Sequence, residues 1–365
     1  MSHLFAPLAL GPLQLSNRIV VAPMCQYSSV DGEANDWHVQ HWGTLSQSGA
    51  GLLITEATAV DPAGRISWAA LGLYDDATEA AFARALASVR RWSPMPVGVQ
   101  LAHAGRKAST LKPWEAGGGA IPDGDPRGWE VVAPSAIPYS AASPLPRALD
   151  QAGIDGVVAA FAEAARRAAR LGLDLIEVHA AHGYLLHQFL SPLSNQRDDD
   201  YGGALENRMR LVLAVFDAVK AAVPPRMSVG IRISASDWVE GGWDLAQSIA
   251  LARVLDARGC HFIHVSSGGL DGRQQIPVGP GYQLPLAQAI KAEVEMPVIA
   301  VGLITEPTHA EAVVATGQAD AVGIARGILY NPRWPWHAAA ALGVKVPVSP
   351  QYRRCEPLAQ RGLFA

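Results

Sequence analysis

Eight short apolar runs, rich in β-branched residues, recur through the chain and limit how it can fold. Runs of this kind are typical of strands buried on both faces of a parallel sheet. They cover residues 18–22, 51–57, 96–101, 174–179, 227–233, 261–266, 297–302 and 321–325.

Amphipathic helical patterns separate most of these runs. The patterns cover residues 78–91, 154–171, 205–223, 245–258, 284–294 and 307–316. Strands that alternate with helices favour an α/β fold built on a parallel sheet. Eight strands favour a (β/α)8 TIM barrel over a doubly wound sheet, and no GxGxxG motif follows the first strand.

Two segments fall outside this alternation. Residues 107–142 are rich in glycine, proline and tryptophan, and they follow the third predicted strand. We expect them to form an excursion over the mouth of the barrel. Residues 331–365 begin with a proline-broken segment and are expected to form a C-terminal arm. A barrel with such insertions accommodates the chain, so we expect residues 1–365 to form a single domain.

Composition narrows the classes of function. Of the 365 residues, 49% are hydrophobic and 17% charged, which suits a globular protein with a large core. The net charge of −4 and the lack of a basic run argue against binding to nucleic acid or to a membrane surface. We expect no signal peptide and no membrane span. The three cysteines lie far apart with no CxxC pair, which favours a reducing, cytoplasmic setting.

Polar and reactive residues gather at the predicted C-terminal ends of the strands, where barrels of this kind carry their active sites. The residues at these ends include Cys25, Gln100, His103, His179, Arg232, Gly302 and Arg326. This distribution predicts a catalytic site at that end of the barrel.

Two histidines follow the fourth strand three residues apart, with a tyrosine two residues further on: His179, His182 and Tyr184. If the chain turns into a helix after His179, this spacing places both rings on one face. The pair then offers two N–H donors to one anion or carbonyl oxygen, with Tyr184 near enough to deliver a proton. Neutral imidazoles are also common metal ligands, and two histidines can simply cap a turn.

Arg232 shares the fifth strand with Ile231 and Ile233, so its cation is expected inside the barrel, where it needs an acceptor. A flavin pyrimidine supplies one, because positive charge near that end of the ring favours the reduced anion. Gln100 is within reach of the same ring edge. A salt bridge from Arg232 to Glu56 or Glu177 is the structural alternative.

Glycine-containing turns after the last two strands, with an arginine, match the usual phosphate site of barrels. Gly302, Ala325 and Arg326 provide these groups, and the guanidinium of Arg326 offers bidentate bonds to phosphate. Tight turns with a solvated arginine remain the alternative. Cys25, in a loop at the mouth, is open to three interpretations: a nucleophile, a cofactor contact or ordinary packing.

Taken together, the motifs resemble the old yellow enzyme family of FMN-dependent ene-reductases, in its cysteine-containing bacterial branch that includes xenobiotic reductases. The resemblance runs from about Leu4 to the tail. Its motifs lie at residues 23–27, 56–60, 100–107, 179–185, 191–195, 197, 201–203, 206–208 and 232–235.

This resemblance implies non-covalent FMN at the strand ends, reduced by NADPH or NADH and reoxidised by an electron-poor alkene. The implied FMN contacts are Ala22, Pro23, Met24, Cys25, Ala57, Gln100, Arg232, Gly302, Ala325 and Arg326. Cys25 is implied to modulate the flavin. His179 and His182 are implied to bind the carbonyl or nitro oxygen of the substrate, Tyr184 to supply the proton, and Tyr27 to line the pocket.

The chain departs from the family pattern in two places. Ala325 stands where many members have glycine, although its backbone N–H is retained. Residues 351–354 resemble an arm that enters a neighbouring subunit's site, which implies a homodimer or homotetramer with Arg354 as a substrate contact. The following Cys355 and Glu356 differ from the family's Gly-Trp. The rival prediction is a metal-dependent barrel hydrolase that uses His103, His179 and His182.

Overall fold

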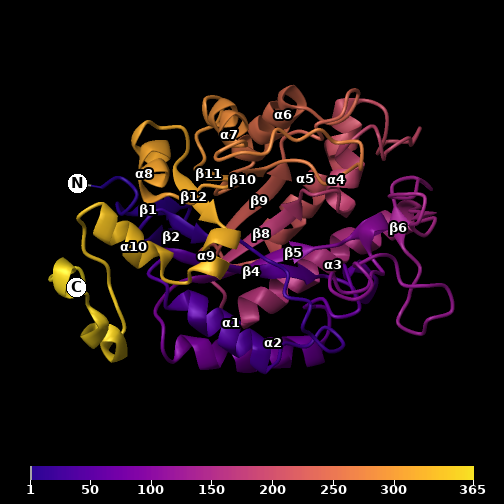
Figure 1. Ribbon diagram of the computed structural model, residues 1–365. Helices are drawn as coiled ribbons and strands as arrows, with labels where there is room; N and C mark the ends of the chain where they lie inside the picture. The colour runs from indigo at the N-terminus through magenta and orange to yellow at the C-terminus, as the bar shows by residue number, and fades with distance from the viewer. Residues whose placement is uncertain (1) are drawn as a thin grey trace.

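The computed structural model describes residues 2–365 and contains a closed barrel of eight parallel strands (Figure 1). The strands, in their order around the barrel, are β3 (Ile19–Val21), β4 (Leu52–Ala59), β5 (Val97–Ala102), β8 (Leu175–Ala180), β9 (Ser228–Ser234), β10 (Ile263–Ser266), β11 (Val298–Val301) and β12 (Ala321–Ile324). The predicted barrel is therefore confirmed. Each predicted strand overlaps an observed one, with ends displaced by at most two residues.

Helices surround the barrel on the outside (Figure 1). They are α1 (Asp36–Ser46), α2 (Asp76–Arg90), α3 (Gln151–Arg170), α4 (Leu185–Leu190), α5 (Leu205–Ala222), α6 (Leu245–Ala257), α7 (Leu284–Lys291), α8 (Pro307–Ala315), α9 (Arg326–Tyr330) and α10 (Trp334–Ala341). Side-chain caps fix several starts: Asp75, Asp150 and Asp244 each accept a backbone N–H in the first turn of their helix. The sequence analysis missed α1, although Asn35 and His38 form a capping box at its start.

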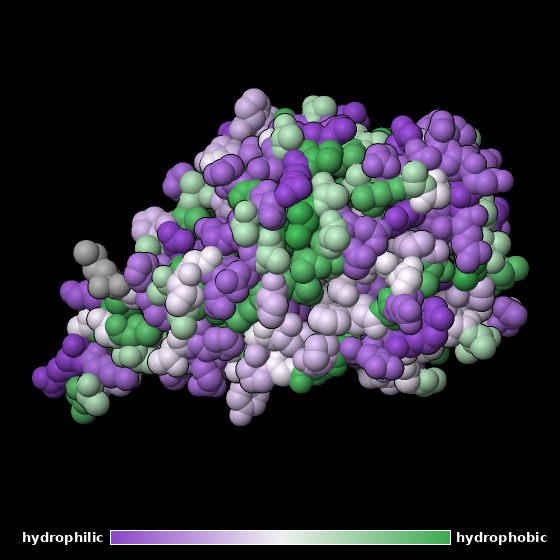
Figure 2. Space-filling view, turned by 90° about the horizontal axis from the view of Figure 1, so that it is seen from above, coloured by the Kyte–Doolittle hydropathy of each residue, from purple (hydrophilic) through white to green (hydrophobic). Residues whose placement is uncertain are grey.

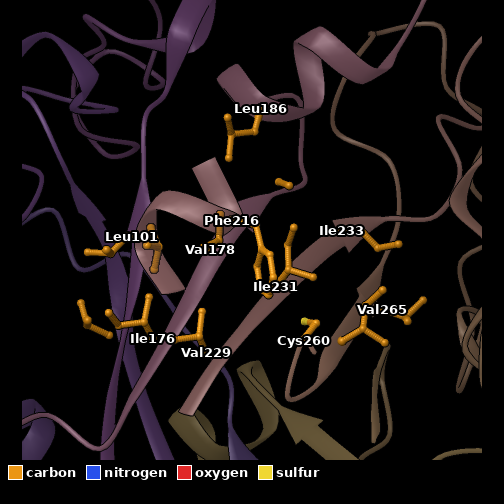
Figure 3. Packing of buried hydrophobic residues seen from close by; sticks show 14 of the residues in the cluster. Leu101, Ile176, Val178, Leu186, Phe216, Val229, Ile231, Ile233, Cys260 and Val265 are labelled. Carbon is orange, nitrogen blue, oxygen red and sulfur yellow. The ribbon is translucent and has the colours of Figure 1, made fainter. Parts of the chain in front are cut away.

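The main apolar core lies between the strands and the helices. Along β9, Val229, Ile231 and Ile233 belong to this core, together with Phe216 of α5 (Figure 3). The residues between them face the other way, because successive side chains of a strand point to opposite faces. Arg232 therefore points into the barrel, as the sequence predicts.

A second apolar cluster fills the N-terminal end of the barrel. It combines Phe262 and residues of several strands with Leu10 and Leu15 of a hairpin made of β1 (Leu8–Leu10) and β2 (Leu13–Leu15). The sequence analysis did not predict this hairpin, because three-residue strands carry almost no periodic signal. The hairpin and Phe262 leave the opposite, C-terminal end of the barrel as the place for a site.

The excursion after β5 is longer than the predicted residues 107–142: it begins with the 3-10 turn η2 (Gly105–Lys107), contains the short strand β6 (Val132–Ala133) and ends with the short strand β7 (Arg147–Ala148). The chain ends in a C-terminal arm with η3 (Pro350–Cys355) and η4 (Leu358–Gln360), which extends away from the barrel (Figure 1). Hydrophilic residues predominate on the face shown in Figure 2, which also carries a narrow apolar band. Within residues 2–365, no helix is long and apolar enough to cross a membrane.

The second apolar cluster, at the N-terminal end of the barrel, leads to a prediction about stability. Phe262→Ala removes a fully buried ring from the closed end of the barrel, so we expect the free energy of unfolding to fall by about 3–5 kcal/mol. Chemical denaturation measures this loss. Leu358→Ala is the control, since that side chain is 81% exposed and its truncation should cost less than about 0.5 kcal/mol. Equal stability of the two variants would show that Phe262 does not stabilise the closed end of the barrel.

Candidate active site

The rings of His179, His182 and Tyr184 form a connected set at the C-terminal end of β8. The ring centroid of His179 lies 5.1 Å from that of His182 and 5.1 Å from that of Tyr184, with edge-on geometry in both pairs. The helix on which the spacing argument was conditional does not form directly after His179. His182 and Gly183 have φ angles of 60° and 73°, in the left-handed region, and α4 begins only at Leu185. A tight turn thus brings the two rings together.

Gly183 is required at this turn. A Cβ at this position would lie 2.2 Å from the carbonyl oxygen of Gly269 in the loop after β10. The turn and that loop are therefore in backbone contact, and no larger residue fits between them.

Both imidazoles are neutral near pH 7. Burial, and after it the charge of Arg232, lower the pKa of His179 and of His182 well below the usual range. The Nδ1 atom of His179 accepts a hydrogen bond from the N–H of Ala181 at 3.3 Å, so the ring proton resides on Nε2 and makes that atom a donor.

The tautomer of His182 depends on Ser266. The Nε2 atom of His182 lies 2.7 Å from Ser266 Oγ. When the hydroxyl donates to Nε2, the ring proton resides on Nδ1, and this atom becomes the donor. Ser266 was not among the predicted site residues, although it is the last residue of the sixth predicted strand, 261–266.

Arg232 is buried and carries no counter-ion. Among residues 2–365 its side chain makes neither a hydrogen bond nor an ion pair, and its Nε atom is buried without a partner. The salt bridge to Glu56 or Glu177, the alternative left open by the sequence, is absent. A buried guanidinium without an acceptor is costly, so its environment suits a ligand that brings acceptor atoms.

Glu177 is instead engaged by two other side chains. Its Oε1 atom accepts from Gln100 Nε2 at 2.7 Å, and its Oε2 atom lies 2.8 Å from His264 Nδ1. Burial alone would raise the pKa of Glu177, but His264 and Arg232 hold it below the usual range. Gln100, expected at a flavin edge, thus also orients this carboxylate. His264 was missed, although its place between Ile263 and Val265 in β10 indicates an inward-facing residue.

A cavity of about 280 Å³ joins several of the predicted cofactor residues. Its walls include His182, Arg232, Gly302, Ala325 and Arg326, which come from four strands or the turns after them: β8, β9, β11 and β12. Gly302 has a φ of 136°, a conformation that L side chains rarely adopt. The cavity therefore combines a buried cation at one point with a second arginine and a glycine turn. Sequence analysis missed Tyr282 and Gln283, which also line it.

The loop after β3 carries the predicted residues 22–27. Ala22 is fully buried and donates its N–H to Ile324 O at 3.1 Å, and the N–H of Gln26 donates to Glu56 Oε2 at 2.8 Å. Pro23 and Met24 are partly exposed. Cys25 and Tyr27 pack with Ala57 of β4 and with Tyr184 in one apolar cluster.

Cys25 is poorly suited to act as a nucleophile. Burial, and then the charge of Glu56, raise the pKa of its thiol to about 12. The neighbouring Cys25, and then burial, raise the pKa of the Tyr27 phenol. Cys25 is therefore a protonated thiol near neutral pH, which favours the cofactor-contact or packing interpretation over covalent chemistry.

A second cavity of about 290 Å³ lies between the excursion and the barrel mouth. Tyr27 and Tyr184 line it together with Lys107, Leu111 and Tyr139 of the excursion. His182 lines the first cavity, Tyr184 lines the second, and His179 lies between the two rings. The three rings thus connect the two cavities.

Two predicted residues lie apart from this set. His103 accepts the N–H of Gly105 through Nδ1 at 3.1 Å, and among residues 2–365 no group of three or more His, Cys, Asp or Glu side chains is arranged to hold a metal ion. The metal-hydrolase alternative therefore has no support in the geometry. Arg354 is exposed on η3 and lines neither cavity within its own chain.

Residues 3–343 match the model of the NADH:flavin oxidoreductase / NADH oxidase family. The chain belongs to this family. The protein is therefore an oxidoreductase, with FMN as its cofactor and NAD(P)H as its hydride donor. The unpaired guanidinium of Arg232 fits the pyrimidine end of this cofactor, and Arg326 with the glycine turn fits its phosphate.

Individual relatives agree with this assignment. The chain is 42% identical over 353 residues to NADPH dehydrogenase of Geobacillus thermodenitrificans, covering 96% of this chain and 98% of the relative. It is also 42% identical over 356 residues to NADPH dehydrogenase of Listeria innocua, covering 97% and 99%. Among solved structures, morphinone reductase is similar with a TM-score of 0.77 and 30% identity, covering 100% of this chain and 93% of that one.

The raised pKa of Cys25 generates a labelling prediction. At pH 8 roughly one Cys25 side chain in 10,000 is a thiolate, so iodoacetamide should label exposed Cys355 and leave Cys25 and Cys260 unmodified. Peptide mass spectrometry of the FMN-free protein measures this and avoids shielding by the cofactor. Cys355→Ser should remove the rapid labelling. Alkylation of Cys25 at the rate of Cys355 would show that its thiol is activated.

Proposed function

We propose that the protein is an NAD(P)H-dependent ene-reductase that acts on electron-poor alkenes such as α,β-unsaturated carbonyl or nitro compounds. The observation that carries the proposal is the unpaired, buried guanidinium of Arg232 in the same cavity as Arg326 and His182. FMN, when bound, supplies the hydride transfer from NAD(P)H to the alkene. Its proposed contacts are Ala22, Pro23, Met24, Cys25, Ala57, Gln100, Arg232, Gly302, Ala325 and Arg326.

His179 and His182 are the proposed donors to the activating oxygen of the substrate. The proton on Nε2 of His179 follows from its bond to Ala181, and Ser266 decides which nitrogen of His182 donates. Two fixed donors stabilise the enolate-like charge that develops on this oxygen, in the manner of an oxyanion hole. Because both rings are neutral, they donate hydrogen bonds without giving up a proton to solvent near pH 7.

Tyr184 is the proposed proton donor to the substrate. Burial raises the pKa of its phenol well above the ordinary value, so the group holds its proton across the physiological range. It lies beside His179, and with Tyr27 it lines the cavity under the excursion. We propose that Tyr27 and Tyr184 contact the substrate in this cavity. Donation to a carbanion-like carbon is favourable even from a weak acid.

Three finer points belong to the same proposal. Relatives are named NADPH dehydrogenase, and a structure of morphinone reductase holds tetrahydroNAD, so we propose that this chain uses NADPH or NADH. Assembly into a homodimer or homotetramer, with Arg354 reaching the substrate site of a neighbouring subunit, stays a prediction. The cytoplasmic location likewise stays a prediction.

Absorbance spectroscopy tests the proposed reaction directly. The purified protein, or protein incubated with FMN, should show a bound-flavin band that bleaches when NADPH is added without oxygen. Cyclohexenone added to the bleached protein should restore the band, because the alkene accepts the hydride. A flavin that bleaches but is not restored by any enone or nitroalkene would contradict the ene-reductase function, although not the family membership.

The histidine pair has its own test. We expect His179→Ala with His182→Ala to retain FMN and to be reduced by NADPH at a measurable rate. Reoxidation by cyclohexenone should fall by at least 100-fold, the loss typical of a single donor of this kind. Stopped-flow spectroscopy separates the two half-reactions. His337→Ala is the control, since that side chain is exposed on α10 and lines neither cavity, and reoxidation should match the wild type. Wild-type reoxidation by the double variant would contradict the proposed role.

A further inference from the structure

The turn that carries His182 and Tyr184 is held through its backbone by side chains from three parts of the molecule. Ser234 Oγ of β9 accepts the N–H of His182 at 2.9 Å, and His187 Nδ1 of α4 accepts the N–H of Gly183 at 2.9 Å. Gln188 Nε2 of α4 donates to Gly183 O at 2.8 Å. The remaining carbonyl, that of His182, is bound by Lys107 of the excursion at 2.8 Å. Lys107 is the only lysine or arginine among these four side chains.

Lys107 joins the turn to the neighbouring loop. Its Nζ atom donates to His182 O and to Gly269 O, each at 2.8 Å. These two backbone segments already touch at Gly183, where no Cβ fits. The ammonium bridges the two negatively polarised carbonyl oxygens that the contact brings together. It thereby fixes the distance between the turn and the loop.

The same ammonium lies against two aromatic rings. Its Nζ atom is 5.1 Å from the ring centroid of Tyr184 and 4.7 Å from that of Tyr139. Among residues 2–365 it forms no ion pair with a carboxylate, so its charge is not cancelled by direct contact. A cation held within about 6 Å of the centre of an aromatic ring is attracted to the negatively polarised face of that ring. The attraction grows when the Tyr184 phenol releases its proton and becomes an anion.

We propose that Lys107 is a positioning residue for proton delivery: it ties the catalytic turn to the Gly269 loop and stabilises the charge that develops on Tyr184. This inference rests on the proposed function for the role of Tyr184 as proton donor. The tie between the turn and the loop does not depend on that role. Lys107 touches the backbone of the site and the ring of the proposed donor, and it acts through them.

The charge of Lys107 is expected to depend on pH. Burial, and then the charge of Arg106, lower the pKa of the ammonium to about 8. The ammonium is therefore present below about pH 8 and is lost as the pH rises through that value. Proton delivery should weaken above about pH 8 for this reason.

The two histidines and Tyr184 beside Lys107 do not titrate in this range. Tyr139 and Arg106 belong to the excursion, and the guanidinium of Arg106 donates to Leu270 O at 3.0 Å. On the barrel side, His179 and His182 are already neutral, since their pKa values are lowered, and the pKa of Tyr184 is raised well above 10. A decline of the rate near pH 8 is thus assigned to Lys107.

Single-turnover kinetics test the charge. We expect Lys107→Met to slow reoxidation of the reduced holoenzyme by cyclohexenone by about 10- to 30-fold at pH 7, while reduction by NADPH changes less than about threefold. The wild-type rate should fall above about pH 8, and Lys107→Arg should keep its rate to pH 10, because guanidinium stays charged. Lys112→Met is the matched control: its ammonium also lies over a ring, that of Trp68 at 4.2 Å, but it does not bind the turn.

Hydrogen exchange of the holoenzyme tests the tie independently of activity. Amides of residues 181–186 should exchange at least tenfold faster in Lys107→Met than in Lys112→Met, since one anchor of the turn is lost. Equal exchange in the two variants would overturn the positioning role. If exchange is faster in Lys107→Met but its reoxidation rate still declines above pH 8 as the wild-type rate does, the electrostatic role is overturned. A wild-type protein that reduces no alkene would refute the proposed function, and the exchange measurement would still decide whether Lys107 holds the turn.

Discussion

The buried guanidinium of Arg232 without a counter-ion is the constraint on which the site depends. Glu177, a buried carboxylate whose charge acts on Arg232, is held by His264 and Gln100. If Glu177 were free to pair with Arg232, the cation would be neutralised within the chain and would offer little to a ligand. The network instead keeps the guanidinium charged and unpaired, so the acceptor comes from the cofactor. Burial, and after it the same charge, lower the pKa of His179 and of His182 and so keep both rings neutral, and this suits them to donate hydrogen bonds.

The second constraint is the backbone turn at His182 and Gly183. Its left-handed conformation places the two imidazoles beside each other, and side chains of β9, α4 and the excursion bind its polar atoms. A turn with so few free backbone groups has few ways to rearrange. The donors are thus preorganised, which is the condition for electrostatic stabilisation of a developing charge.

Much of the fold could be predicted from sequence, for a definite physical reason. Strands buried on both faces are almost entirely apolar, and helices on the outside have one apolar stripe, so the two periods alternate clearly along the chain. The elements that were missed include the three-residue strands of the hairpin that closes the barrel and the helices α1, α4, α9 and α10. The hairpin is stable because Leu10 and Leu15 pack in one cluster with Phe262. Phe262 lies 252 and 247 positions further along the sequence, yet it is adjacent to them in the folded barrel.

The sequence by itself determined the barrel, its catalytic end and the set of residues that gathers there, because strand direction places every C-terminal end on one side. Motif resemblance also indicated the family, which the comparisons then confirmed. Only the tertiary structure decided which groups are paired. It showed that Glu177 binds His264 rather than Arg232, that a turn rather than a helix joins the two histidines, and that Lys107 reaches the turn from the excursion. Such pairings depend on distances between residues far apart in sequence, and local periodicity contains no information about them.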